Sequence, residues 1–386
     1  DRLLSRGLGD VYKRQNIEGA ISFKALLFLP KAKPFQIARP DEDYGPKLYS
    51  QKVLILENSK ELLPVWLRFI KWVVETSDVS LNVSREMLQN DATLSKIQKN
   101  LVKKILDELK KQLKDHREDY EKFFEHFGEI LKEGIHYDFE NKSIIAETVL
   151  LHSLNQDKKI TLDEYLDAKP ADQKDIYYLT GSDINQLKNS PYIEKLRAKG
   201  YDVLLLPDPI DEWVVQALQE YKETKLTSAS AGDLDLWDEK SEEWRDKSEE
   251  KKKQKKDMKE FLARLKVILG KETVESVEVT DRLVDSPSVL TVEKGGLTPQ
   301  MEAMMKSMGQ PVPPSKKSLE LNPNHTLVEA MKSEFDRDPK SEKLENMTRF
   351  LHDQSILAEW GQIEDMHGFI GRMNVIAKEY LSKSKQ

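Results

Sequence analysis

Alternating apolar and polar positions open the interpretable part of the chain and predict a β-sheet. One side of the first predicted strand carries Ile21, Phe23, Ala25 and Leu27, as the two-residue period of a strand requires. A second strand is predicted over residues 48–56, after a polar loop. Over residues 62–74 the apolar positions recur at helical spacing, so we predict a helix there.

Helical periodicity then dominates residues 84–131. Ser84 is suited to cap a helix whose apolar positions continue to Leu101. Further helices are predicted over residues 101–113 and 123–131. Together with the predicted strands, these helices give an α/β domain built as an α/β/α layer.

A βαβ unit is predicted downstream. Two short apolar runs, residues 176–179 and 203–206, flank a helix that begins at Ser190 and Pro191. The strands of such a unit lie parallel. Many βαβ units bind nucleotides, but Gly181 stands alone in the first turn, without a glycine-rich phosphate loop. We therefore predict no nucleotide site in this small subdomain.

Composition changes sharply at residues 233–257, which are almost all charged, and we interpret this stretch as a solvated linker. Beyond it, helical spacing and short apolar runs predict an α+β domain. Its helical stripe consists of Met258, Phe261, Leu262, Leu265, Ile268 and Leu269. Its predicted sheet positions are Val277, Val279, Val289 and Leu290.

Four of the ten methionines share one face of a short predicted helix, residues 297–308. They are Met301, Met304, Met305 and Met308. The periodicity alone favours a helix face buried in a core. The alternative is an adaptable surface for varied partners, because thioethers are flexible and polarisable.

Two apolar stripes lie near the end of the chain. The first consists of Leu344, Met347 and Leu351, and the second of Met366, Phe369, Ile370, Met373, Ile376, Ala377, Tyr380 and Leu381. Adjacent amphipathic helices at one end of a chain need a partner surface, which a four-helix bundle across a two-fold axis supplies. Packing inside the same domain explains the periodicity equally well.

A donor-rich group lies at the start of the helix that Ser84 caps. Arg85 falls in the first turn, where the helix dipole favours an acid over a cation, and Gln89 follows one turn later. Together with the free N–H groups of the helix, these side chains form a patch suited to a phosphate. The alternative is a solvated surface arginine.

Composition excludes several classes of protein. The chain has 386 residues, 33% of them charged, and a formal net charge of −7. It is long enough for two or three domains, and nothing in its charge favours nucleic acid. It has no cysteine, and its seven histidines form no zinc motif, so no metal site is predicted. No apolar run is long enough to cross a bilayer, and we expect a cytoplasmic protein with no membrane partner.

The stretch LNVSREMLQ, residues 81–89, resembles the catalytic loop in the middle domain of the heat shock protein 90 chaperones. In that family the arginine of the Ser-Arg-Glu triplet reaches the γ-phosphate of ATP held by a separate N-terminal domain. The resemblance implies that Arg85 is the catalytic and ATP-contacting residue and that Gln89 assists it. Ser80 occupies a position at which many members have proline. This difference changes neither Arg85 nor Gln89.

Other segments resemble the same family in the same order. NIEGAISFKALLFLPKAKPF, YYLTG and PIDEW resemble its middle domain, whereas LELNPNHTLVEAM and LHDQSILAEWG resemble its dimerisation domain. The resemblance implies that client proteins contact Glu212, Trp213, Gln216 and the methionine helix, although helical spacing alone also suits Trp213 as a core residue. It further implies a homodimer whose interface consists of Leu344, Met347, Leu351, Phe369, Ile370, Met373, Ile376 and Tyr380.

We therefore expect the middle and C-terminal domains of a chaperone of the bacterial high-temperature protein G type. The expected order is a large α/β subdomain (16–135), a small α/β subdomain (136–232), the charged linker (233–257) and an α+β dimerisation domain (258–386). Residues 1–15 resemble translated sequencing-adaptor read-through, and we interpret them as non-native. ATP and Mg²⁺ are expected on the N-terminal domain of the full-length protein, with no cofactor and no turnover in this chain alone.

The function that the resemblance implies is ATP-dependent chaperoning of non-native client proteins, with the homodimer acting as a clamp. The alternative is a nucleotide-independent dimeric scaffold that shares the fold. A free-standing α/β enzyme finds no support, because the sequence has neither a glycine-rich phosphate loop nor a nucleophile motif.

Overall fold

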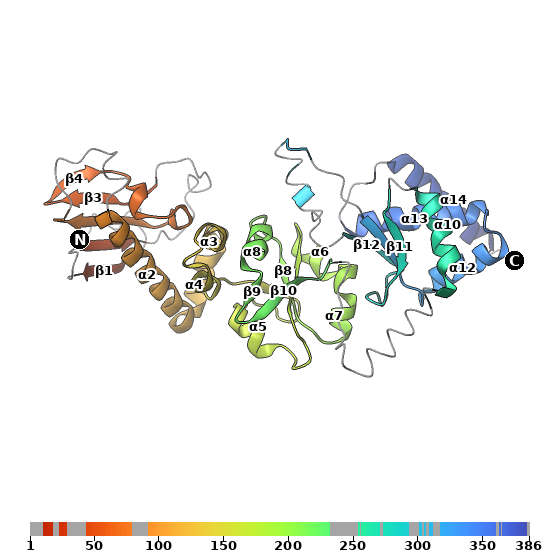
Figure 1. The fold of residues 1–386 in the computed structure, drawn as a ribbon, viewed down its shortest axis with the longest axis horizontal. Helices are drawn as coiled ribbons and strands as arrows, with labels where there is room; N and C mark the ends of the chain where they lie inside the picture. Colours follow the sequence, from red (N-terminus) through yellow and green to blue (C-terminus); the bar gives the residue numbers. More distant parts are fainter. Residues whose placement is uncertain are drawn as a thin grey trace. The chain divides into compact units, whose positions relative to one another are not determined.

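The computed structural model describes residues 11–17, 23–28, 44–78, 92–231, 254, 256–270, 273–292, 301–302, 305, 309–311, 317–359, 363 and 365–383. These residues form mixed α/β structure, as predicted, in two compact units (Figure 1). The first unit combines Asp1–Leu151, Lys159–Leu166 and Ile210–Tyr221, and the second combines His152–Lys158, Asp167–Pro209 and Lys222–Gln386. The predicted domain boundaries and the interpretation of residues 1–15 stay predictions. Residues 233–253 and 255 of the predicted linker lie outside the described residues.

A five-stranded mixed sheet belongs to the first unit. Its strands are β1 (Val11–Ile17), β2 (Phe23–Phe28), β3 (Lys47–Ser50), β4 (Val53–Leu56) and β5 (Lys71–Thr76), in the order β1-β2-β5-β3-β4. β5 pairs in parallel with β3, and the other neighbours are antiparallel. Phe23 and Ala25 are buried, which confirms the alternation predicted for this strand.

The single strand predicted over residues 48–56 is wrong, because the chain turns back between β3 and β4. Gln51 and Lys52 occupy the turn with φ angles of 47° and 68°. Two consecutive residues in the left-handed region are typical of a tight hairpin turn. Such turns are usually marked by Asn-Gly or Asp-Gly, so Gln-Lys gave no signal in the sequence.

The helix predicted over residues 62–74 is also wrong. Two short 3-10 helices, η2 (Lys60–Leu62) and η3 (Val65–Leu67), are followed by β5. Pro64 favours an extended residue before it, and Leu63 is extended, with φ −144° and ψ 119°. The β-branched residues that follow favour a strand, whose buried face carries Trp72, Val74 and Thr76.

Two long helices bury their apolar faces in the first unit. α2 (Ala92–Asp115) contacts η2, and α3 (Arg117–Tyr137) contacts η3 and α2. The two helices predicted between residues 84 and 113 are one helix over their described part, since α2 continues through Leu101. The stripe predicted around residue 127 is confirmed, because Phe127 is buried and its ring centroid lies 5.1 Å from that of Phe69.

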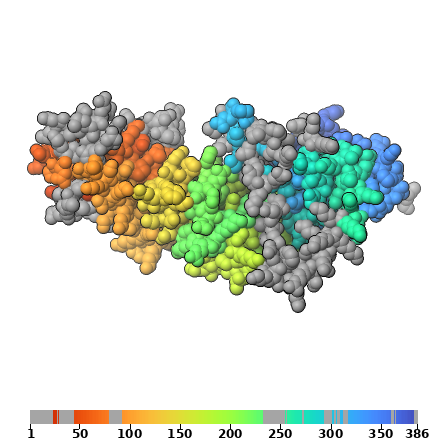
Figure 2. Space-filling view, in the orientation of Figure 1, coloured from red at the N-terminus to blue at the C-terminus, as the bar shows by residue number. Residues whose placement is uncertain are grey.

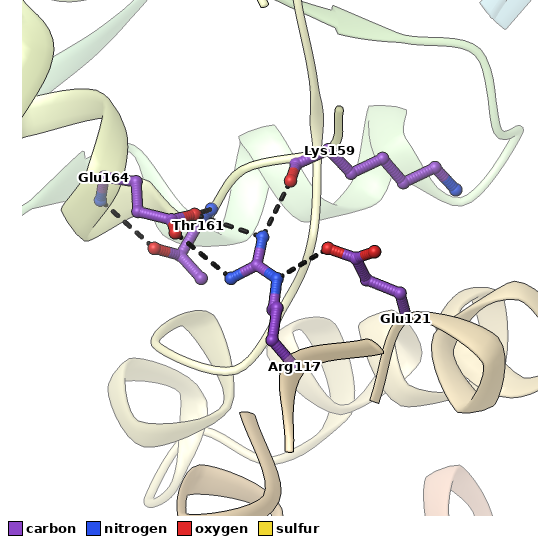
Figure 3. A network of polar contacts seen from close by, with 5 residues as sticks. All are labelled: Arg117, Glu121, Lys159, Thr161 and Glu164. Carbon is purple, nitrogen blue, oxygen red and sulfur yellow. Dashed lines mark hydrogen bonds and ion pairs between the residues drawn. The ribbon is translucent and has the colours of Figure 1, made fainter. Parts of the chain in front are cut away.

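Arg117, the first residue of α3, connects that helix to the segment that begins at Lys159 (Figure 3). Its guanidinium donates to Glu121 at 2.7 Å, to both carboxylate oxygens of Glu164 at 3.2 Å, and to the Lys159 carbonyl at 2.7 Å. Thr161 and Glu164 form a capping box at the start of α5 (Leu162–Ala168). One carboxylate therefore both caps α5 and binds Arg117.

The second unit contains the predicted βαβ unit. β6 (His152–Ser153), β8 (Val203–Leu206), β7 (Ile176–Thr180) and β10 (Thr224–Ser228) lie in that order. β7 and β8 pair in parallel, as predicted. Between them lie α6 (Ile184–Lys188), η4 (Pro191–Ile193) and α7 (Glu194–Ala198). The Ser190 hydroxyl accepts a hydrogen bond from the Tyr192 N–H at 3.3 Å and so caps η4.

The C-terminal part of the second unit is a sheet with helices, as predicted (Figure 1). The strands β11 (Ser276–Val279), β13 (Lys317–Leu321) and β12 (Ser288–Val292) lie in that order. Their core is shared with α10 (Lys259–Leu269), α12 (Thr326–Arg337) and α13 (Glu342–Ala358), and α14 (Met366–Lys383) contacts α13. All six members of the stripe predicted from Met258 to Leu269 are buried in this core.

β12 takes part in two cores, because successive strand residues face opposite sides of a sheet. Leu290 packs with the C-terminal helices, whereas Val289 packs with Leu283 and the βαβ residues Tyr192 and Val203. The βαβ unit and the C-terminal sheet therefore share a buried junction along β12.

Candidate functional site

The predicted catalytic residues Arg85 and Gln89 lie outside the described residues, which resume at the start of α2. The described part of that helix buries Leu94, Ile97 and Leu101, as the pattern after Ser84 predicted. The contact of Arg85 and Gln89 with ATP stays a prediction.

The helix α8 (Asp211–Leu218) carries the three residues predicted to contact clients. Trp213 is 36% exposed, and Gln216 is exposed on the same side of the helix, one turn away. Glu212 is only 3% exposed, so its side chain does not share that surface. Trp213 is thus partly exposed and partly packed against its neighbours, and the choice between a client contact and a core residue stays a prediction.

A buried ion pair fixes the first turn of α8. The ammonium of Lys132, on α3, lies 2.6 Å from the Asp211 carboxylate, and the two side chains are 4% and 0% exposed. A carboxylate in the first turn also suits the positive end of the helix dipole. α8 is therefore bound to α3 by an ion pair that is buried away from water.

Three further exposed aromatic residues, His136, Tyr137 and Phe139, lie at the end of α3 or just after it, and His136 contacts Trp213. The His136 ring centroid lies 5.2 Å from that of Trp213 and 4.9 Å from that of Tyr137. Tyr137 is 64% and Phe139 81% exposed. We name His136, Tyr137, Phe139 and Trp213 the aromatic surface.

Local contacts hold the aromatic surface in place. After α3 ends, the Asp138 carboxylate accepts hydrogen bonds from the Asn141 N–H and side-chain amide at 3.0–3.1 Å. The Lys142 ammonium, at the start of α4 (Lys142–Ala146), lies 4.8 Å from the Phe139 ring centroid and donates to the Ala217 carbonyl of α8 at 3.0 Å. Exposed rings on an ordered turn are therefore connected to the same helix as Trp213.

Tyr137 and Phe139 are not among the site residues predicted from the sequence. Tyr137 continues the helical spacing of the α3 stripe, which indicates a buried position, but the helix ends there and leaves the ring exposed. The one usable signal was the sequence Asp-Phe-Glu-Asn at residues 138–141, because a large apolar residue among turn-forming polar residues suggests exposure.

The methionine helix lies mostly outside the described residues. Met301 and Met305 are helical and half-buried, and Met304 and Met308 are not described. Whether the four share a surface or a core stays a prediction.

The two C-terminal stripes differ in their surroundings. On α13, Leu344 and Leu351 are buried in the core of their own domain and Met347 packs against it. On α14, the apolar residues are mostly exposed: Met366 48%, Ile370 50%, Met373 47%, Tyr380 75% and Leu381 66%. Phe369 is 9% exposed and stacks on Phe350. In the space-filling view the blue C-terminal residues lie at the surface (Figure 2).

Among the described residues, no cluster of His, Asp or Glu side chains is arranged to hold a metal ion. Likewise, none of the described helices is long and apolar enough to span a membrane.

Comparison with known proteins matches nearly the whole chain to one family. A family model described as "Hsp90 protein" matches residues 10–386. "Chaperone protein HtpG" of Geobacter sulfurreducens is 40% identical over 350 residues, which are 90% of this chain and 53% of that protein. The protein of the same name from Bdellovibrio bacteriovorus is 40% identical over 350 residues, or 90% of this chain and 55% of the relative.

A third relative, "Chaperone protein HtpG" of Alkalilimnicola ehrlichii, is 38% identical over 373 residues, or 96% of this chain and 56% of the relative. The chain thus spans about half the length of the relatives that it matches. A family match over nearly every residue, joined to this identity, shows that the chain belongs to the Hsp90 family.

Proposed function

We propose that the chain is the client-binding and dimerising part of an ATP-dependent Hsp90-type chaperone. The aromatic surface is the observation that carries this proposal, because it places exposed rings on a rigid base. Apolar groups exposed together mark interaction sites, and aromatic residues dominate the binding energy of protein interfaces. A surface of rings suits the exposed apolar segments of a non-native protein.

The client contacts begin with Trp213 and Gln216 on α8, to which we add Tyr137 and Phe139 beside them. Glu212 is buried, so we leave it out of the proposed contact surface. The methionine helix, with Met301, Met304, Met305 and Met308, supplies a second contact region of adaptable shape.

The dimer forms chiefly through α14. Its exposed apolar residues Met366, Ile370, Met373 and Tyr380 lie along a helix of 18 residues, and a second copy of the same helix covers such a face across a two-fold axis. Leu344 and Leu351 support the interface from within their own core.

The nucleotide belongs to the N-terminal domain of the full-length protein, with Mg²⁺. Arg85 is proposed to stabilise the charge that develops on the γ-phosphate, with Gln89 beside it, so that domain closure and hydrolysis are coupled.

A binding titration with a labelled, permanently unfolded reporter protein tests the client site. Trp213→Ala is expected to weaken binding roughly five- to thirtyfold, because truncating a central aromatic residue costs about 1–2 kcal/mol. The melting temperature should change little, since the ring is partly exposed.

Val53→Ala is the matched control, because Val53 is 52% exposed in the same unit but lies on β4. Unchanged binding with a lowered melting temperature in Trp213→Ala would return Trp213 to the core. No binding of the reporter by the unsubstituted chain would favour the dimeric scaffold.

A further inference from the structure

Two neighbouring residues of α3 bind two different parts of the first unit. Lys132 pairs with Asp211, at the start of α8. The next residue, Glu133, pairs with Arg68, which directly follows η3. Consecutive positions of a helix point about 100° apart, so a single turn of α3 reaches both partners. This turn of α3 therefore binds both α8 and the end of η3 through ion pairs.

The contact between Arg68 and Glu133 has a geometry that fixes direction. Two nitrogens of the guanidinium donate to the two carboxylate oxygens at 2.5 and 2.7 Å. Such paired hydrogen bonds add geometric specificity to the charge interaction. One of the two nitrogens also donates to the Val65 carbonyl of η3 at 3.1 Å. The side chains of Arg68 and Glu133 are 5% and 19% exposed, so this contact is largely shielded from water.

Close packing leaves η3 little room to shift against α3. A Cβ atom on Gly134, the residue after Glu133, would lie 2.7 Å from the Trp66 ring of η3, a separation that real side chains do not adopt. Phe69, directly after Arg68, is fully buried, and its ring centroid lies 5.1 Å from that of Phe127 on α3. Densely packed interiors transmit strain. A change in the position of this turn of α3 therefore reaches the chain around Arg68.

The chain around Arg68 leads directly to the segment that contains Arg85. β5 begins at Lys71 and lies between β2 and β3, in the middle of its sheet. The hydroxyl of Thr76, the last residue of β5, accepts a hydrogen bond from the Asp78 N–H at 3.2 Å. Arg85 follows seven positions after Asp78. The point from which the chain continues toward Arg85 is thus set by β5 and by the anchored segment before it.

We propose that Glu133 and Arg68 are positioning residues that couple client binding at the aromatic surface to the action of Arg85 on ATP. This proposal rests on the function proposed above. A client bound to the aromatic surface orders α8 on α3, and the ordered α3 holds Arg68 and the start of β5 in one arrangement. Order that the client has already supplied no longer has to be created when Arg85 acts, so turnover rises.

ATP turnover tests this coupling in a fusion that joins a matching N-terminal ATPase domain ahead of Asn16. The kcat is measured with and without a saturating amount of the permanently unfolded reporter protein. Reporter binding should raise kcat at least about fivefold, the lower end of ordinary coupling between two sites. In Glu133→Gln the rise should be less than about twofold, because the paired hydrogen bonds to Arg68 are lost. The affinity for the reporter should stay within about twofold, because the aromatic surface keeps its residues.

A double variant separates positioning from simple stabilisation. Glu133→Gln leaves the Arg68 cation buried without its carboxylate, which lowers stability. Arg68→Met combined with Glu133→Met removes both charges, and replacing a buried ion pair by apolar residues of similar volume is often neutral or stabilising. A purely structural pair predicts that this double variant regains both the melting temperature and the rise in kcat. Positioning predicts that only the melting temperature returns, because flexible thioether chains fix no direction.

Glu164→Gln is the matched control, because it weakens another ion pair of α3, the one that Arg117 forms with α5. The reporter should still raise kcat at least about fivefold in this variant. Three results would overturn the positioning role and leave client binding in place: a rise that survives in the double variant, a rise lost equally in Glu164→Gln, or no rise in the unsubstituted fusion with the reporter bound. Failure of the unsubstituted fusion to bind the reporter would overturn the proposed function and the positioning role together.

Discussion

At the scale of single residues, Lys132 decides how the helix that carries Trp213 is held. It occupies a buried position on α3 and pairs with Asp211, which is fully buried. Taking both charges out of water costs several kcal/mol, so the pair adds little net stability by itself. Removing one partner is different, because the other then stays buried without its opposite charge.

We therefore expect Lys132→Met to lower the free energy of unfolding by about 3–5 kcal/mol, measured from urea denaturation midpoints. Lys99→Met is the matched control, because the Lys99–Glu140 pair is 67% and 71% exposed, and exposed pairs contribute at most about 1 kcal/mol. Similar losses in the two variants would show that the buried pair does not anchor α8.

The sequence indicated only part of this arrangement. A client contact at Trp213 and Gln216 is predicted from a motif and stays a prediction. Nothing in a single sequence shows that Lys132, among the apolar residues of α3, pairs with a residue 79 positions later. Contacts between distant residues depend on the folded chain, and the same holds for Tyr192 and Glu359, which are 167 positions apart.

At the scale of elements, long helices are predicted from the sequence more reliably than short helices and strands. α3 and α10 have long apolar stripes with clear helical spacing, and both were predicted. Residues 62–74 combine two 3-10 turns with a six-residue strand, and over so short a span apolar spacing suits a helix as well as a strand. The extended backbone before Pro64 is the feature that rules out one continuous helix over this segment.

α14 is the element whose proposed role depends on a second copy. Ile370→Asp is expected to weaken dimerisation at least about a hundredfold, because a two-fold axis introduces the charge into the apolar interface twice. Sedimentation equilibrium measures the change. Arg372 connects α14 to α13 through Asp353 at 2.5 Å, so the helix should keep its place in the monomer.

Val267→Asp, on α10, serves as the control for this prediction. Val267 is 70% exposed but belongs to neither apolar stripe at the end of the chain. A dimer that survives Ile370→Asp, or that dissociates equally in Val267→Asp, would remove α14 from the interface.

At the scale of the whole molecule, the relatives of the Hsp90 family are about twice as long as this chain. We propose that client binding at the aromatic surface, dimerisation and ATP hydrolysis are coupled. This coupling requires a separate domain that binds ATP. Arg85 is the residue through which this chain is proposed to act on that nucleotide, and the proposal rests on the motif that surrounds it. ATP turnover with a matching N-terminal ATPase domain joined ahead of Asn16 tests the role directly.

In that fusion, Arg85→Ala should lower kcat roughly ten- to a thousandfold while ATP affinity barely changes. A charge that contacts the γ-phosphate mainly in the transition state affects the rate more than ground-state binding. Arg349→Ala is the control, because Arg349 is an exposed arginine on α13 that pairs with Glu345 in the next turn. Equal turnover in Arg85→Ala and the unsubstituted fusion would exclude Arg85 from the chemistry. The aromatic surface and the proposed dimer interface on α14 would then be better explained as parts of a scaffold that works without nucleotide.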